Sequence, residues 1–163
     1  MRKIIVLLLL SCSGKMLFAQ ADTSLLYLRF PILPPLSILK IPDSTKFTKT
    51  DLKKNTATLI FIFSPDCGHC QKETEELIAH EDLFKKIQII MSSPVEYSYL
   101  KQFYTNYKIA DHPNITIGMD PGYFLGTFYR VRSFPALYLY DKKGNFIKSF
   151  DGNVPVKEIA EAL

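Results

Sequence analysis

Residues 56–70 decide the fold, reading Thr-Ala-Thr-Leu-Ile-Phe-Ile-Phe over 56–63 and Ser-Pro-Asp-Cys-Gly-His-Cys over 64–70. The first eight are mostly β-branched or aromatic and show no apolar/polar alternation, which predicts a central strand buried on both faces. The next ten, 71–80, contain no glycine or proline and are rich in Lys and Glu, which predicts a helix. Two cysteines therefore stand at the junction between a buried strand and a helix.

The spacing of Cys67 and Cys70 indicates chemistry rather than structure. A disulfide across two intervening residues adds little stability, because the stabilisation grows with the length of the closed loop. At a helix start, unpaired N–H groups and the positive end of the helix dipole favour a thiolate on Cys67, and the imidazolium of His69 would favour it further. We expect Cys67 to attack a disulfide and Cys70, shielded one turn inside the helix, to resolve the mixed disulfide.

Strands and helices alternate around this motif. The further predicted strands are 37–41, 86–91, 114–119, 135–140 and 146–150. The further predicted helices are 95–107, a short helix that follows a turn at 120–122 and runs through Tyr129, and 154–163. Residues 20–33 form a mixed lead-in in which prolines are expected to break any regular element. The pattern predicts one α/β domain over residues 34–163, with a mixed central sheet flanked by helices.

The first 19 residues predict an export signal. Arg2 and Lys3 precede the apolar run 4–10, which is too short for a membrane span. We expect cleavage after Ala19, which leaves no transmembrane span in the mature chain. The alternative is Leu-Ser-Cys at 10–12, which resembles a bacterial lipobox and would place a lipid anchor on Cys12. The expected location is the periplasm of a Gram-negative bacterium.

Charge argues against a nucleic-acid partner. The formal net charge is +4, but the first 19 residues contain three basic residues and no acid. The remainder is nearly balanced and has no basic patch along the chain.

The motif Cys67-Gly68-His69-Cys70 is the active-site sequence of protein disulfide isomerases, and the chain resembles the thioredoxin-fold thiol:disulfide oxidoreductases. Ser-Phe-Pro-Ala at 133–136 resembles the cis-proline loop of that family, which faces the cysteines. An N-terminal strand extension and a strand–helix unit inserted before this loop resemble the exported TlpA/ResA-like subgroup. The resemblance covers residues 34–163. It implies no cofactor, protein disulfides or dithiols as substrates, and a membrane or periplasmic thiol donor as redox partner.

The resemblance also assigns roles to individual residues. Pro135 is expected to follow a cis peptide bond, which places Phe134 beside Cys67, where its backbone can pair with an extended substrate. Glu73 matches the acid of the TlpA/ResA-like group and is the candidate for proton transfer, whereas Phe61 stands where thioredoxins have a buried acid. An equal alternative for Glu73 is a solvated charge on a Glu-rich helix face.

Two questions stay open from the sequence. Copper or zinc handling through Cys67 and Cys70, with His69 or His112, is the alternative function, but two thiolates fall short of the four ligands of a closed zinc site, so we predict no metal. The direction of exchange is the second question. The histidine in the motif indicates an oxidising couple, while the TlpA/ResA resemblance indicates reduction, and we rank reductase slightly ahead of oxidase.

Overall fold

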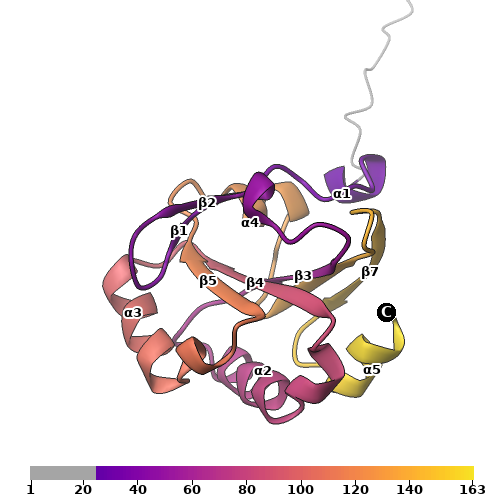
Figure 1. The fold of residues 1–163 in the computed structure, drawn as a ribbon. Helices are drawn as coiled ribbons and strands as arrows, with labels where there is room; N and C mark the ends of the chain where they lie inside the picture. Colours follow the sequence, from indigo (N-terminus) through magenta and orange to yellow (C-terminus); the bar gives the residue numbers. More distant parts are fainter. Residues whose placement is uncertain (1–24) are drawn as a thin grey trace, which may run out of the picture.

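A seven-stranded mixed sheet forms the centre of the computed structural model, which describes residues 25–163 (Figure 1). The strands are β1 (Ser37–Lys40), β2 (Lys46–Thr48), β3 (Ala57–Ile62), β4 (Ile87–Ser93), β5 (Ile115–Met119), β6 (Ala136–Tyr140) and β7 (Phe146–Asp151). Their spatial order is β2-β1-β5-β4-β3-β6-β7. The helices are α1 (Leu26–Arg29), α2 (Gly68–Ala79), α3 (Tyr97–Asn106), α4 (Phe124–Tyr129) and α5 (Val156–Glu161), with short 3-10 helices η1 (Lys49–Asp51), η2 (Glu81–Phe84) and η3 (Ile109–Asp111). The predicted mixed α/β architecture is confirmed.

Strand β3 lies in the interior of the sheet, between β4 and β6, because its side chains are mostly apolar on both faces. It pairs in parallel with β4 and antiparallel with β6, and Leu59 lies opposite Ile89 on one side and Leu139 on the other. Every residue of β3 after Ala57 is buried. The carboxyl end of this strand leads directly into the cysteine motif, which therefore follows a buried interior strand.

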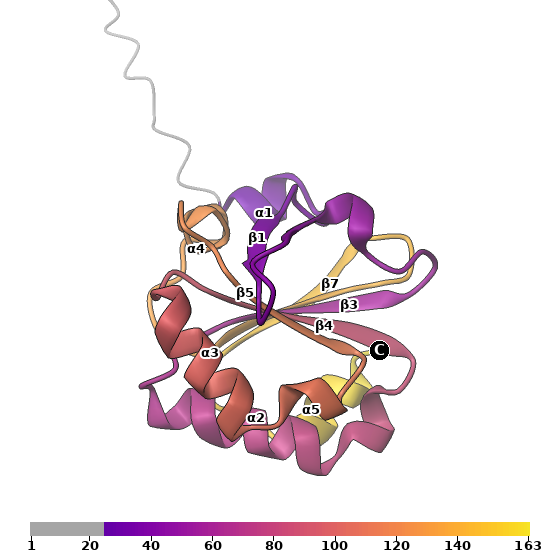
Figure 2. The same cartoon turned by 60° about the vertical axis from the view of Figure 1, so that its left-hand side comes forward.

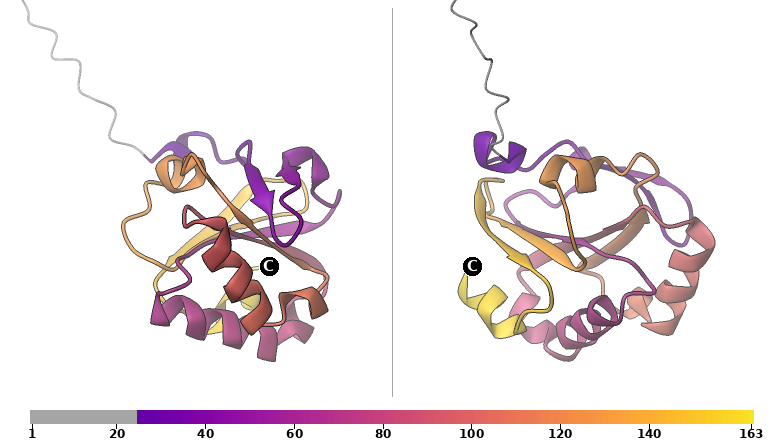
Figure 3. Two further views of the ribbon diagram at one scale, coloured as in Figure 1. Left: turned by 90° about the vertical axis from the view of Figure 1, so that its left-hand side faces the viewer. Right: turned by 180° about the vertical axis from the view of Figure 1, so that it is seen from behind.

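The two faces of the sheet bury separate apolar clusters. Leu59, Phe61 and Phe63 belong to the first core, which α2, α3 and α5 cover. Ile60 and Ile62 point the other way into the second core, which includes side chains of α1 and α4. Figures 2 and 3 show this layering, with α2, α3 and α5 on one side of the sheet and α1 and α4 on the other. The alternate direction of successive strand residues accounts for the division.

The lead-in contributes more to the fold than its prolines predict. Instead of an irregular segment, residues 26–29 form the short helix α1, since the first proline comes only at position 31. Tyr27 is buried in the second core, with ring centroids 5.2–5.7 Å from those of Tyr129, Tyr138 and Phe146. Within the described residues, the packed domain therefore includes α1, ahead of the expected start at residue 34. The expected export signal, with Cys12 and Ala19, lies outside the described residues.

An N-terminal hairpin extends the sheet beyond β5. The expected strand at 37–41 is β1, and the polar stretch around Phe47 forms the edge strand β2, with Phe47 paired opposite Ile38. Strand β1 also pairs antiparallel with β5, where a Cβ on Gly118 would lie 2.7 Å from Ile38 Cδ1 and 2.9 Å from the Leu39 carbonyl oxygen. Glycine at this position permits the close approach of the two strands.

Candidate active site

The cysteine motif forms the start of helix α2. Cys67 is the N-cap residue, with extended backbone angles, and its sulfur accepts a hydrogen bond from the backbone N–H of Cys70 at 3.4 Å. The helix consequently begins at Gly68, three residues earlier than the composition predicts. The same sulfur thus lies at the positive end of the helix dipole, where negative charge is stabilised.

The two thiols differ sharply in environment. Cys67 is half-buried, whereas Cys70 is 0% exposed, and both are free thiols in the structure. Burial, followed by its hydrogen bond with Cys67, holds the pKa of Cys70 well above its ordinary value. A solvent-borne disulfide can reach only the first sulfur, so Cys67 has the geometry of the attacking residue and Cys70 that of the resolving one.

The loop before β6 supplies the opposite wall of the site. The Phe134–Pro135 peptide bond is cis, as predicted, and the Cys67 thiol points at the carbonyl oxygen of Phe134 across 3.7 Å. Antiparallel pairing of β3 with β6 explains this proximity, because Ile62 at the end of β3 faces Ala136 at the start of β6. The Phe134 side chain is half-buried and packs against both cores.

Glu73 is a buried acid and not a solvated charge. Its side chain is 0% exposed, and Oε2 accepts hydrogen bonds from Asn153 Nδ2 at 2.6 Å and from the Val154 N–H at 3.0 Å. Oε1 is buried without a partner. Desolvation raises the pKa of Glu73 above its ordinary value, although the two donors act in the opposite direction. Glu73 follows Cys70 by three positions in the helix, so both side chains lie on one face of α2.

The remaining motif residues lie at the surface. His69 is exposed, and among residues 25–163 no hydrogen bond joins it to either sulfur. Asp66 is exposed and accepts a short hydrogen bond from the Ser64 hydroxyl. Gln71 Nε2 donates to the Pro65 carbonyl at 2.8 Å, which fixes the turn that leads into the helix.

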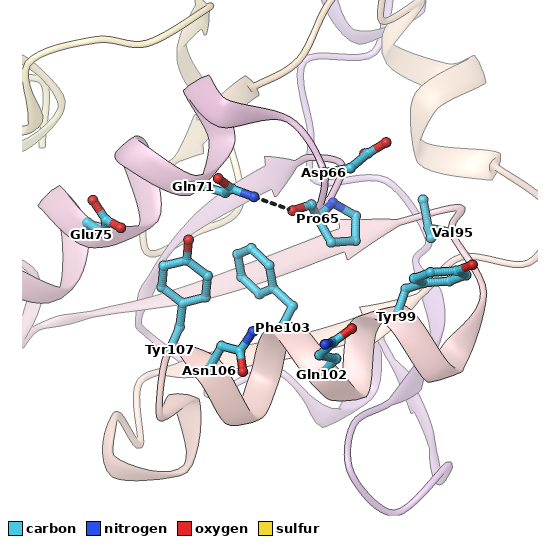
Figure 4. A pocket seen from close by; sticks show the side chains of 10 residues that line it. All are labelled: Pro65, Asp66, Gln71, Glu75, Val95, Tyr99, Gln102, Phe103, Asn106 and Tyr107. Carbon is cyan, nitrogen blue, oxygen red and sulfur yellow. Dashed lines mark hydrogen bonds between the residues drawn. The ribbon is translucent and has the colours of Figure 1, made fainter.

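A groove between α2 and α3 begins one residue before Cys67 (Figure 4). Its volume is about 730 Å³, and its lining residues are Pro65, Asp66, Gln71, Glu75, Val95, Tyr99, Gln102, Phe103, Asn106 and Tyr107. The aromatic residues of the predicted helix at 95–107 are expected to be core residues. Phe103 is buried as expected, but Tyr107 is only half-buried. The lining residues from α3 and its C-cap share one helix face, because they are spaced at 99, 102, 103, 106 and 107. That face becomes one wall of a groove only because α2 packs beside it.

Metal ligands do not gather around the cysteines. Within the described part of the chain, no group of three or more His, Cys, Asp or Glu side chains could hold a metal ion. His112 Nδ1 lies 2.7 Å from a Glu81 carboxylate oxygen, and His80 lies beside Glu76. No helix in residues 25–163 has the length and apolarity needed to cross a bilayer.

Sequence comparison identifies the family. The profile of the thioredoxin-like domain matches residues 45–163, which include the motif, the cis-proline loop and α5. The chain belongs to the thioredoxin-like family. Its fold is the one typical of thiol:disulfide oxidoreductases. No curated protein sequence matches the chain.

Solved structures share this fold at low sequence identity. StoA from Bacillus subtilis is 16% identical, with a TM-score of 0.64 over 81% of this chain and 98% of its own. A secreted disulfide oxidoreductase of Mycobacterium tuberculosis is 16% identical, with a TM-score of 0.62 over 78% and 92%. The exposed lipoprotein thioredoxin of Streptococcus pneumoniae is 18% identical, with a TM-score of 0.60 over 80% and 100%.

Proposed function

We propose that this protein is an exported thiol:disulfide oxidoreductase that exchanges disulfides with polypeptides through Cys67 and Cys70. The observation that carries the proposal is the arrangement of the two sulfurs. A half-exposed cysteine caps a helix, beside a peptide carbonyl, and a fully buried cysteine lies one turn behind it.

In the reducing direction the exchange has two steps. The Cys67 thiolate attacks one sulfur of a substrate disulfide, forms a mixed disulfide and expels the other substrate sulfur as a thiolate, which takes up a proton. Cys70 then loses its proton and attacks the Cys67 sulfur, which releases the second substrate thiol. The substrate gains two electrons, and the protein is left with a Cys67–Cys70 disulfide that a thiol donor must reduce.

Four further residues support these steps in our proposal. Glu73, on the same helix face as Cys70 and with one unpartnered oxygen, accepts the proton that Cys70 must lose. The backbone at Phe134 and Pro135 pairs with the extended substrate beside Cys67. His69, exposed next to the nucleophile, stabilises the thiolate when protonated.

Structural neighbours and the N-terminal sequence support export. Of the structural neighbours, one is a secreted disulfide oxidoreductase and another is an exposed lipoprotein thioredoxin. The apolar segment at 4–10 follows two basic residues, as in a secretory signal. We infer periplasmic placement, membership in the TlpA/ResA-like subgroup, and a reductase role slightly ahead of an oxidase role.

Trapping the intermediate tests the exchange mechanism. The reduced protein should reduce insulin, and Cys70→Ser should accumulate a mixed disulfide at Cys67 that mass spectrometry identifies, because nothing is left to resolve it. Changing Cys67 to Ser should abolish both the reduction of insulin and the formation of the mixed disulfide. Tight stoichiometric copper or zinc binding, with no disulfide exchange, would favour the metal-handling alternative.

The reduction potential tests the direction. Equilibration of the protein with glutathione should give a potential below roughly −220 mV for a reductase. A value near roughly −120 mV, the range of strong oxidants, would reverse the ranking.

A further inference from the structure

The charge of the side chains that line the groove between α2 and α3 suits a positively charged side chain. Two carboxylates line it, Asp66 at the end next to Cys67 and Glu75 on α2, and none of its lining residues is a lysine or arginine. Among the described residues, neither carboxylate forms an ion pair with a lysine or arginine. The lining of the groove therefore carries a net negative charge, one residue away from Cys67.

Its neutral lining also suits a cation. The rings of Tyr99 and Tyr107 line the α3 side of the groove, Tyr107 near Glu75 and Tyr99 at the other end beside Val95. Phe103, stacked on Tyr107 with centroids 4.3 Å apart, forms an apolar floor. Ring faces attract lysine and arginine heads, and an apolar floor accepts their methylene stems. The amide oxygens of Gln102 and Asn106 add hydrogen-bond acceptors along the same face.

The position of the groove determines which part of a substrate enters it. Pro65 and Asp66 lie at its near end, so the Cα of Asp66 is one peptide unit, about 3.8 Å, from that of Cys67. Glu75 follows Cys67 by eight residues on α2, a rise of about 12 Å. A lysine or arginine close to the reacting cysteine of an extended polypeptide can therefore place its charged group between Asp66 and Glu75.

We propose that the groove selects polypeptide substrates that carry lysine or arginine next to the cysteine attacked by Cys67. The inference rests on the proposed function and names its substrate class. Glu75 and Asp66 act as specificity residues through charge, while the ring of Tyr107, near Glu75, contacts the basic side chain. The sulfur chemistry is unchanged by the identity of the neighbouring residue.

Symmetric peptide disulfides provide the test. Three short peptides with one central cysteine, flanked by Lys, by Gln or by Glu, are each oxidised to the dimer, so that both sulfurs are equivalent. Exchange with the reduced full-length protein is measured and divided by the rate of dithiothreitol with the same peptide. We expect kcat/KM to rank the Lys peptide above the Gln peptide and the Glu peptide last. The ratios should shrink as salt is added.

Variants of α2 locate the effect. Glu75→Gln should lower the Lys-to-Gln ratio by about two- to fivefold, the value of one exposed charge pair. Glu75→Lys should place the Glu peptide above the Lys peptide. The matched control is Glu76→Gln, which removes the same charge from a residue that lies beside His80 and outside the groove.

Three results would overturn the inference. Equal normalised rates for the three peptides would show that the groove does not read charge, while the proposed exchange function would stand. Equal losses in Glu75→Gln and Glu76→Gln would assign the preference to overall charge instead of the groove. Failure to exchange with any of the peptides would overturn the proposed function and this inference together.

Discussion

The two cysteines of the motif illustrate how position alone separates chemically identical residues. Cys67 caps α2 and is half-exposed, whereas Cys70 is fully buried with a raised pKa. We predict that iodoacetamide near neutral pH modifies Cys67 at least about tenfold faster than Cys70 in the reduced protein, because only a reachable thiolate reacts. Peptide mapping after a short pulse measures the two rates. Comparable rates, or faster labelling of Cys70, would reverse the assignment.

Glu73 is expected to make stability depend on pH in an unusual sense for an acid. Burial raises the pKa of Glu73, so its charged form is less stable in the folded than in the unfolded chain. The unfolding free energy should therefore fall as pH rises from the ordinary pKa of Glu through the raised one. Glu73→Gln removes this titration, so the unfolding free energy of the variant should rise relative to that of the wild type as pH increases. Denaturant unfolding of both proteins at several pH values between about 4 and 8 measures this difference. A difference in unfolding free energy that does not change with pH would contradict the prediction.

At the scale of elements, the β1–β2 extension depends on one glycine. A Cβ at Gly118 would press on Ile38 and on the backbone of β1, whereas one at Gly122 meets nothing within 4 Å. We predict that Gly118→Ala lowers the unfolding free energy by about 1–3 kcal/mol, and that the control Gly122→Ala changes it by less than about 0.5 kcal/mol. Thermal or denaturant unfolding compares the two. Equal effects would show that β1 accommodates the methyl group freely.

The elements also show which parts of the fold can be predicted from sequence. β3, α2 and the cis-proline loop are predictable, because an unbroken apolar run and a short motif carry their signals locally. The burial of Glu73 is not predictable, since Glu75 and Glu76 share its composition and its partners Asn153 and Val154 come eighty residues later. The groove is missed for a similar reason, because it arises only where two helices distant in sequence pack together.

In the whole molecule, the candidate active site lies over one face of the sheet and α1 packs on the other. The reacting groups lie over the first core, while α1 closes the second core through Tyr27. We predict that Tyr27→Ala lowers the unfolding free energy by about 3 kcal/mol and leaves disulfide exchange unchanged at temperatures where the protein is folded. Leu28→Ala is the control, because Leu28 is 55% exposed on the same helix. A loss of exchange in the folded Tyr27 variant would show that the two faces are coupled.

The capping bond at Cys67 implies that the helix itself takes part in each turnover. The sulfur that we propose as the nucleophile is also the acceptor for the backbone N–H of residue 70. Once that sulfur joins a mixed disulfide it carries less negative charge and accepts the bond more weakly, so the first turn of α2 loosens while substrate is attached and tightens on release. Amide hydrogen exchange at residue 70 would follow this cycle. It should be faster in the trapped Cys70→Ser intermediate than in the same variant with Cys67 free.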